Sequence, residues 1–273
     1  MRKHRLIQLA LNLGAIALAA VTVIALQMPR IKVEREGQTI ESDRRWLRRE
    51  QARLDILQTL PRSGFGYNNL IADITFLNFL QYFGDDMARE THQTGYGLSP
   101  DYFEIIIEHD PHFVDAYLFA SFGVSVYAAQ PEKTIAMYEY GLRRMQPEKQ
   151  PYAYTVWRRK ASDELLLLNR PQDAIESYLN AADWADRATF GEDTLPEVEV
   201  VAQRSRETAA FLQSDPDSKS ARISAWSDVL AVAFDQKTFD IAVAELNKLG
   251  IGVRADENGN LQTFSLEPPQ SNN

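Results

Sequence analysis

The 273-residue chain contains no cysteine and only four histidines. The absence of cysteine excludes disulfides, thiolate metal sites and cysteine nucleophiles, although it does not assign a redox compartment. The sequence also lacks a Gly-x-Ser-x-Gly elbow, a phosphate-binding loop and a Rossmann glycine cluster. Motifs therefore give enzyme chemistry no support, and we predict no catalytic residue and no cofactor.

The two closest histidines, His109 and His112, do not have the spacing of a metal site. Two histidine ligands on one helical face are four residues apart, as in zinc-binding helices. Pro111 also interrupts any helix that would carry both. The acidic pairs Asp85-Asp86 and Glu192-Asp193 are too short for a calcium loop, so we predict no metal site.

Charge is distributed unevenly along the chain, whose net charge is -9. Residues 1–62 carry 12 Lys and Arg against 6 Asp and Glu, whereas the remainder carries 17 against 32. An acidic body argues against nucleic acid as a partner, because phosphates require a basic face. The basic N-terminal part favours a nearby anionic surface, for which a membrane is the obvious candidate.

The longest uncharged run, Leu6-Met28, follows the basic N-terminus. An α-helix needs about 20 residues to cross the hydrocarbon core, and this run is long enough. A cleaved signal peptide has a shorter apolar region and an Ala-x-Ala-like site, which Ala25–Pro29 fits poorly. We predict a transmembrane anchor over residues 1–29, in contact with the lipid bilayer through Leu6-Met28.

Residues 30–63 are predicted to form a basic juxtamembrane helix and linker, with the helix over Ser42–Leu60 and Ser42 as its N-cap. The residues expected at a membrane surface are Arg44, Arg45, Trp46, Arg48 and Arg49. Such a helix can lie on anionic headgroups with its tryptophan at the interface. The alternative is a solvated helix that packs its leucine edge on the first repeat.

Residues 64–249 are predicted to form an α-helical domain of hairpins joined by short turns. The expected helices cover 70–83, 99–109, 115–127, 131–146, 152–168, 171–185, 194–213, 220–234 and 237–249. The first of these is apolar almost all round, which predicts a central and buried position. Thr91–Leu98 is expected to be an exposed loop.

The pattern of apolar residues changes to a period of two after Gly250, where the helical domain is expected to end. Two alternating runs flank Asn258-Gly259, and this dipeptide is a strong hairpin signal. We predict a small β-hairpin over residues 250–266 and a disordered tail over 267–273.

Two of the expected helices carry similar residues at similar spacing. Ala174 and Tyr178 lie on one helical face, and Ala181 continues it. Ala136 and Tyr140 repeat the pair 38 residues upstream. A repeated helical hairpin is typical of a stacked scaffold that holds another protein.

Segments 99–147 and 151–185 resemble tetratricopeptide repeats. Tyr117 lies where the aromatic residue of the first helix belongs, six residues after Pro111. Pro111 and Pro147 match the proline that follows the second helix. The chain departs from the family pattern in three respects. Its repeat interval is 38 residues, the Leu-Gly pair of the first helix is missing, and Trp157 is out of phase with the expected aromatic position.

The resemblance implies an all-α fold, a helical-hairpin (TPR-like) repeat solenoid with an N-terminal transmembrane helix and a small C-terminal β-hairpin. Gly64–Asp86 is also similar to a segment of membrane-anchored repeat proteins of bacteria, cyanobacteria among them. This implies a scaffold that takes part in assembly or stabilisation of a membrane complex, photosynthetic in a phototroph. We expect a single-pass protein of a bacterial inner or thylakoid membrane, with its body on the periplasmic or lumenal side.

In such repeats the first helix of each hairpin lines the binding face. The residues that this frame places in a partner-binding groove are Leu118, Phe122, Val126, Arg159, Asp163 and Leu166. A mainly apolar groove with a charged end suits an amphipathic helix of a protein partner. Leu118 and Phe122 could instead belong to the core.

Two other functions remain open from the sequence. A periplasmic hydrolase on a helical scaffold would need paired carboxylates with separated pKa values in a closed pocket. A self-association module would show only contacts between copies.

Overall fold

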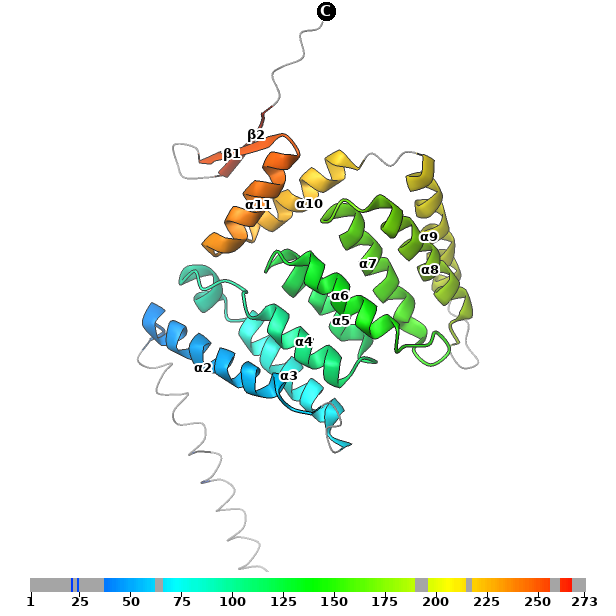
Figure 1. Cartoon of the computed structure of the whole chain (residues 1–273). Helices are drawn as coiled ribbons and strands as arrows, with labels where there is room; N and C mark the ends of the chain where they lie inside the picture. The colour runs from blue at the N-terminus through cyan, green and yellow to red at the C-terminus, as the bar shows by residue number, and fades with distance from the viewer. Residues whose placement is uncertain are drawn as a thin grey trace, which may run out of the picture. The chain divides into compact units, whose positions relative to one another are not determined.

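The computed structural model describes residues 37–61, 66–189, 196–214, 218–255 and 261–266, together with positions 21 and 24. It is an α-helical structure with a two-stranded antiparallel sheet near its C-terminus, which confirms the predicted fold class at this level (Figure 1). The predicted anchor over Leu6-Met28, the hairpin turn at Asn258-Gly259 and the tail over 267–273 lie outside the described residues. Among the residues that the structure describes, no helix has the length and apolar character needed to span a bilayer.

The chain divides into two compact units, Met1–Trp46 and Leu47–Asn273. The described α-helices are α2 (Ile40–Gln58), α3 (Asn68–Phe83), α4 (Ser99–His109), α5 (Val114–Ala120), α6 (Pro131–Leu142), α7 (Tyr154–Leu166), α8 (Pro171–Arg187), α9 (Pro196–Ser214), α10 (Lys219–Ala231) and α11 (Gln236–Lys248). Short π- or 3₁₀-helical segments are η2 (Met87–Thr91), η3 (Ser121–Val126) and η4 (Pro151–Ala153). The strands are β1 (Ile251–Ala255) and β2 (Leu261–Ser265).

Helix α2 begins two residues before the predicted start, because Thr39 and not Ser42 is its N-cap. The Ser42 N–H donates to Thr39 Oγ1 at 3.1 Å, and the Thr39 N–H donates to Ser42 Oγ at 3.0 Å. This reciprocal pair satisfies two donors that a helix start leaves open. In the second half of α2, Leu54 is fully buried and Leu57 packs against the core. The leucine edge therefore packs on the helical body, as the alternative interpretation of this helix expected.

The largest cluster of buried residues lies among α3, α4, α5 and α6, and aromatic rings dominate it. The ring centroids of Phe79 and Phe103 are 4.5 Å apart, in an edge-to-face arrangement. Glycines permit the close approach of helices here. A Cβ atom on Gly141 of α6 would lie 1.9 Å from the hydroxyl oxygen of Tyr117 on α5.

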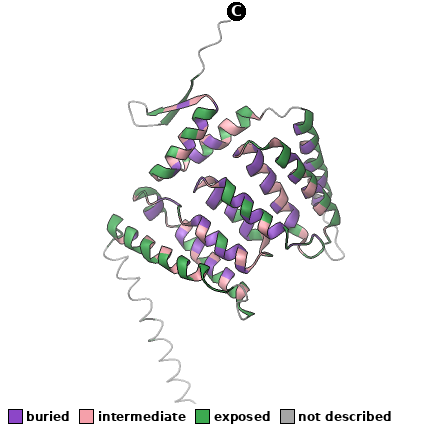
Figure 2. Ribbon diagram, viewed as in Figure 1, coloured by how far each residue is buried: buried purple, intermediate pink, exposed green. Residues whose placement is uncertain are grey.

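Helix α3 is only half buried, which corrects the prediction that it is central and buried. Its buried face carries Ala72, Thr75, Phe79 and Tyr82, whereas Leu70, Ile74 and Leu77 on the opposite face are 49–58% exposed (Figure 2). The periodicity was misleading because apolar residues surround the helix, but only one side of it packs on α4 and α5.

The predicted exposed loop, Thr91–Leu98, is in part buried, because Tyr96 is only 2% exposed. The π-helical turn η2 comes before it, and its Arg89 is also almost completely buried. The Arg89 guanidinium lies 4.4 Å from the ring centroid of Tyr82 and donates to the Gly95 carbonyl at 3.1 Å. Aromatic neighbours and a backbone acceptor therefore hold the guanidinium inside the structure.

The structure identifies a repeat with an interval of 40 residues, where the sequence predicted 38. Two hairpins, α5–η3 with α6 and α7 with α8, align at this interval without a gap. The matched positions are Pro111 with Pro151, Tyr117 with Trp157, Pro131 with Pro171, Ile135 with Ile175, Tyr138 with Tyr178 and Gly141 with Ala181. Ala129 and Asn169, which precede the second helices, share a positive φ of 49° and 54°. Trp157 is therefore in phase with the repeat, and the exposed Ala136 is not the counterpart of the buried Ala174.

Helices α10 and α11 form a further hairpin whose buried cluster includes Leu167, which directly follows α7. Asp235 caps α11 by accepting the Thr238 N–H at 3.1 Å. Gly250 follows the helix with φ of 82°, the left-handed conformation that favours glycine after a C-terminus. The strands β1 and β2 pair with Val253 opposite Thr263, which confirms the predicted hairpin within residues 250–266.

Candidate partner-binding site

The exposed apolar side chains nearest the predicted groove come from α5 and η3. Leu118 is 38% exposed and Phe122 is 46% exposed, and Phe119 between them is also exposed. From α7, the Arg159 guanidinium carbon lies 5.5 Å from the Phe122 ring centroid. The structure thus brings together Leu118, Phe122 and Arg159 from successive repeats. We call the surface formed by Leu118, Phe119, Phe122, Arg158 and Arg159 the α5–α7 face.

Two shallow hollows mark this face. The first, of about 210 Å³, lies between α5 and α7 and includes Leu118, Thr155 and Arg159 in its lining. The second, of about 230 Å³, is lined by Thr155, Arg158, Arg159 and Ser162. Neither arginine forms an ion pair with a residue inside the described ranges. The face therefore offers two cations and two hydroxyl groups beside an apolar surface, with the carboxylate of Asp115 at the first hollow.

Asp163 does not line the groove, which corrects its predicted place. It is 5% exposed and accepts a hydrogen bond of 2.6 Å from the Ser125 hydroxyl on η3. Burial raises the pKa of this carboxyl to about 7, and Ser125, Arg159 and Ser121 lower it by less than burial raises it. Asp163 therefore joins the first helices of two repeats instead of facing a partner.

Val126 and Leu166 are half-buried and also lie within the packing of the helices. Val126 packs against the cluster of α10 and α11, and Leu166 packs against the cluster shared by α7, α8 and α9. Of the six groove residues predicted from the sequence, the structure thus brings three together on one exposed face and places three in helix packing.

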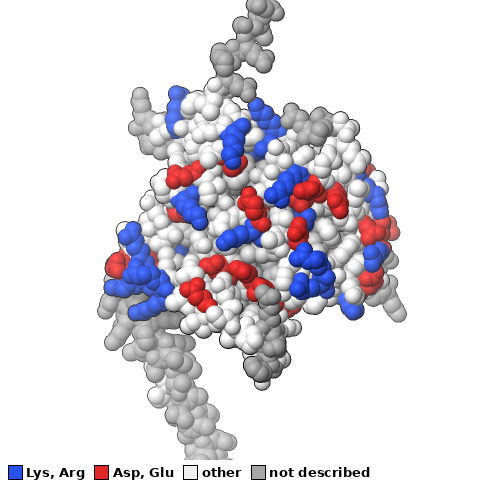
Figure 3. Space-filling model, in the orientation of Figure 1, with Lys and Arg blue, Asp and Glu red and all other residues white. Residues whose placement is uncertain are grey.

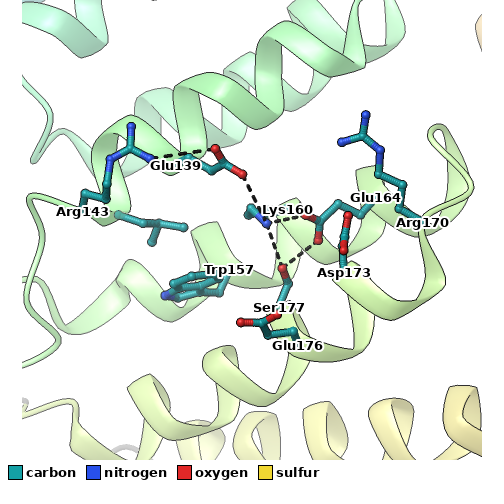
Figure 4. Close-up of a pocket in the computed structure, with 10 residues that line it drawn as sticks. Glu139, Arg143, Trp157, Lys160, Glu164, Arg170, Asp173, Glu176 and Ser177 are labelled. Atoms are coloured by element: carbon teal, nitrogen blue, oxygen red, sulfur yellow. Dashed lines mark hydrogen bonds and ion pairs between the residues drawn. The ribbon is translucent and has the colours of Figure 1, made fainter.

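A buried ionic network, which the sequence did not indicate, lies between α7 and α8 (Figure 4). Lys160 forms an ion pair with Glu164 and donates to Ser177 Oγ at 3.2 Å. The Ser177 hydroxyl in turn donates to Glu164 at 2.7 Å. All three residues are buried, and Glu139 of α6 lies 3.9 Å from the Lys160 ammonium. The only sequence signal is the opposite charge four residues apart, which usually marks an exposed pair.

This network forms the floor of an open hollow of about 430 Å³ whose rim carries charged groups of both signs. The lining also includes Arg143, Trp157, Arg170, Asp173 and Glu176. Ser177 donates its proton to Glu164 and accepts a hydrogen bond from Lys160. Its hydroxyl is therefore both a hydrogen-bond donor and an acceptor, and the network links α7 to α8.

The two histidines considered as metal ligands contact different parts of the structure. His109 Nδ1 lies 3.2 Å from Asn68 Oδ1, whereas His112 Nε2 lies 3.1 Å from the Arg144 carbonyl oxygen. Within the described residues, no group of three or more His, Asp or Glu side chains is arranged to hold a metal ion.

The predicted membrane-surface residues of α2 are exposed. This applies to Arg44, Arg45, Trp46, Arg48 and Arg49. Figure 3 shows basic side chains gathered over the first half of this helix, whereas both signs are mixed elsewhere on the drawn face. An exposed arginine cluster beside a tryptophan can interact with anionic headgroups.

The fold and the site define an all-α protein built from helical hairpins. No protein-family model, no curated protein and no solved structure matches the chain.

Proposed function

We propose that this protein is a membrane-anchored helical-repeat scaffold of tetratricopeptide-like type that binds another protein through the α5–α7 face. The single observation that carries the proposal is the exposure of Leu118, Phe119 and Phe122 beside Arg158 and Arg159, neither of which forms an ion pair among the described residues. Clusters of exposed apolar side chains with a polar rim are typical of protein-binding surfaces.

The 40-residue repeat supports the scaffold class. Each hairpin buries its apolar residues against the next, so a binding face is built from successive first helices. A role in assembly or stabilisation of a membrane complex is the function that this scaffold fits, because an anchor at Leu6-Met28 would raise its local concentration near membrane partners.

The chemistry of the face indicates the kind of segment it binds. Leu118 and Phe122 are four residues apart and fit the apolar stripe of an amphipathic helix. Arg158 and Arg159 would pair with acidic residues at one end of that helix. We therefore propose a partner helix whose apolar stripe runs into an acidic segment.

The proposal is tested by purifying the full-length protein from gently solubilised membranes and identifying co-purified proteins by mass spectrometry. Replacing Leu118 and Phe122 together by Asp should reduce recovery of a defined partner at least about tenfold, because a hot-spot loss exceeds 1.4 kcal/mol. Both side chains are partly exposed, so the variant should retain its circular dichroism spectrum.

Leu179→Asp is the matched control, because Leu179 is 45% exposed and lies on α8, outside the α5–α7 face. It should leave partner recovery unchanged. Equal recovery with the Leu118/Phe122 variant and the wild-type protein would overturn the proposed binding face.

A further inference from the structure

Helix α3 carries an apolar surface that the proposed scaffold function does not use. Tyr67 precedes the helix and is 64% exposed, and Leu70, Ile74 and Leu77 are about half exposed. These positions are three or four residues apart, so they form one stripe along the outer face of α3. We call these four residues the α3 stripe. At 1.5 Å per residue it is about 15 Å long.

The other side of α3 packs against neighbouring helices of the fold. Phe76 contacts the rings of Phe113 and Phe119 at 5.1 Å, and Phe79 contacts Phe103. The α3 stripe is therefore a second apolar face on a helix already packed, and its exposure is a cost unless something covers it.

The size of the stripe distinguishes the possible occupants. Four side chains that are about half exposed present on the order of 400 Å², whereas a stable protein interface buries about 800 Å² on each partner. A second copy of the chain or a folded partner would thus need further surface. A bilayer does not, because a helix can lie in the interface plane with only its apolar face inserted.

The chain that precedes the stripe supports a bilayer as its occupant. Leu6-Met28 is a bilayer-length apolar run, and α2, the helix that precedes α3 in the chain, carries exposed Arg48 and Arg49. Arginines favour anionic headgroups, and a tethered surface needs little affinity of its own to stay in contact. Ile56, near the end of α2, is also 65% exposed and adds apolar surface before α3.

We propose that the α3 stripe inserts into the lipid–water interface of the membrane that anchors the chain. This inference rests on the anchor in the proposed function. The contact would hold the first hairpin against the bilayer through apolar side chains, with arginines of α2 at the headgroups.

The absence of cysteine provides a direct test with the full-length chain. A single cysteine, Ile74→Cys, is labelled with an environment-sensitive nitrobenzoxadiazole dye and reconstituted into phosphatidylcholine–phosphatidylglycerol vesicles. We expect a blue-shifted emission, a several-fold loss of quenching by aqueous iodide, and quenching by spin-labelled lipid. Leu179→Cys, equally labelled, is the matched control and should retain its emission and iodide quenching.

The outcomes separate this inference from the anchor. If the protein floats with the vesicles but the dye at position 74 is quenched by iodide as at position 179, the stripe is not in the bilayer while the anchor stands. If the protein does not float with the vesicles, the membrane anchor and the insertion of the α3 stripe are both overturned. A blue shift in detergent without vesicles that grows with protein concentration would identify a second copy as the occupant and overturn the bilayer proposal.

Discussion

Replacing Lys160 by methionine is expected to lower the free energy of unfolding by about 3–5 kcal/mol, as measured by urea unfolding of the full chain in mild detergent. The substitution leaves the carboxylate of Glu164 buried without its cation. Ser177 would remain as a donor to that carboxylate, but one neutral hydroxyl does not replace the ammonium.

A double variant shows whether the loss of stability comes from the unpaired charge of Glu164 or from altered packing. Lys160→Met with Glu164→Leu removes both charges and should recover most of the lost stability. Lys133→Met, on the exposed face of α6, is the control and should change stability by no more than about 0.5 kcal/mol. A single Lys160→Met variant as stable as the wild-type protein would contradict the buried network.

The second large effect is a pH dependence of stability that depends on Asp163. Burial raises the pKa of this carboxyl from 3.8 to about 7 in the folded protein. The folded state therefore binds more protons than the unfolded state between these values, and its stability falls as the pH rises through 7. From pH 5 to pH 8, the Asp163 contribution should decrease by about 2.5 kcal/mol.

Asp163→Asn removes this titration and keeps a side chain that can accept the Ser125 hydroxyl proton. The variant should be more stable than the wild-type protein at pH 8, and the difference should shrink at pH 5. Urea unfolding at pH 5, 6.5 and 8 measures both curves. Asp173→Asn, at an exposed carboxyl on α8, should follow the wild-type curve. Parallel curves for Asp163→Asn and the wild-type protein would contradict the raised pKa.

The order and type of the helices could be predicted from the sequence because their boundaries carry strong local signals. Pro100, Pro131 and Pro171 stand at helix starts, and Gly250 ends the last helix. The repeat interval was harder to predict from the sequence. The Ala and Tyr pairs compared in the sequence are 38 residues apart, whereas the helices that carry them repeat at an interval of 40. The difference of two residues becomes visible only from the burial of the side chains and from the matching positive φ angles of Ala129 and Asn169.

Burial was harder to predict than helicity. The apolar residues of α3 indicate a helix that avoids water, but the sequence cannot tell which side packs on its own fold. Arg89 shows the opposite case, because a charged residue between α3 and α4 is buried with its guanidinium over the ring of Tyr82. Both outcomes depend on neighbours that are distant in sequence.

Only part of the candidate site could be predicted, because its burial also depends on neighbours that are distant in sequence. Leu118, Phe122 and Arg159 meet on one face because the repeat frame was nearly right. The same repeat frame assigned Asp163 to that face, but the Ser125 hydroxyl on η3 gives its carboxyl a buried partner. The sequence analysis did not identify the Lys160–Glu164 pair, since charges four residues apart on a helix are usually exposed, whereas this pair is buried between α7 and α8.

The central claim, that the α5–α7 face binds a partner, is tested most directly by crosslinking in native membranes. A benzophenone group attached to Phe122→Cys of the full-length protein is activated by light, with Leu179→Cys as the control. The account predicts a crosslink from position 122 to one defined protein, at a segment with an apolar stripe and acidic residues, and none from position 179. Equal labelling of many proteins from both positions, or crosslinks only to lipid, would contradict it.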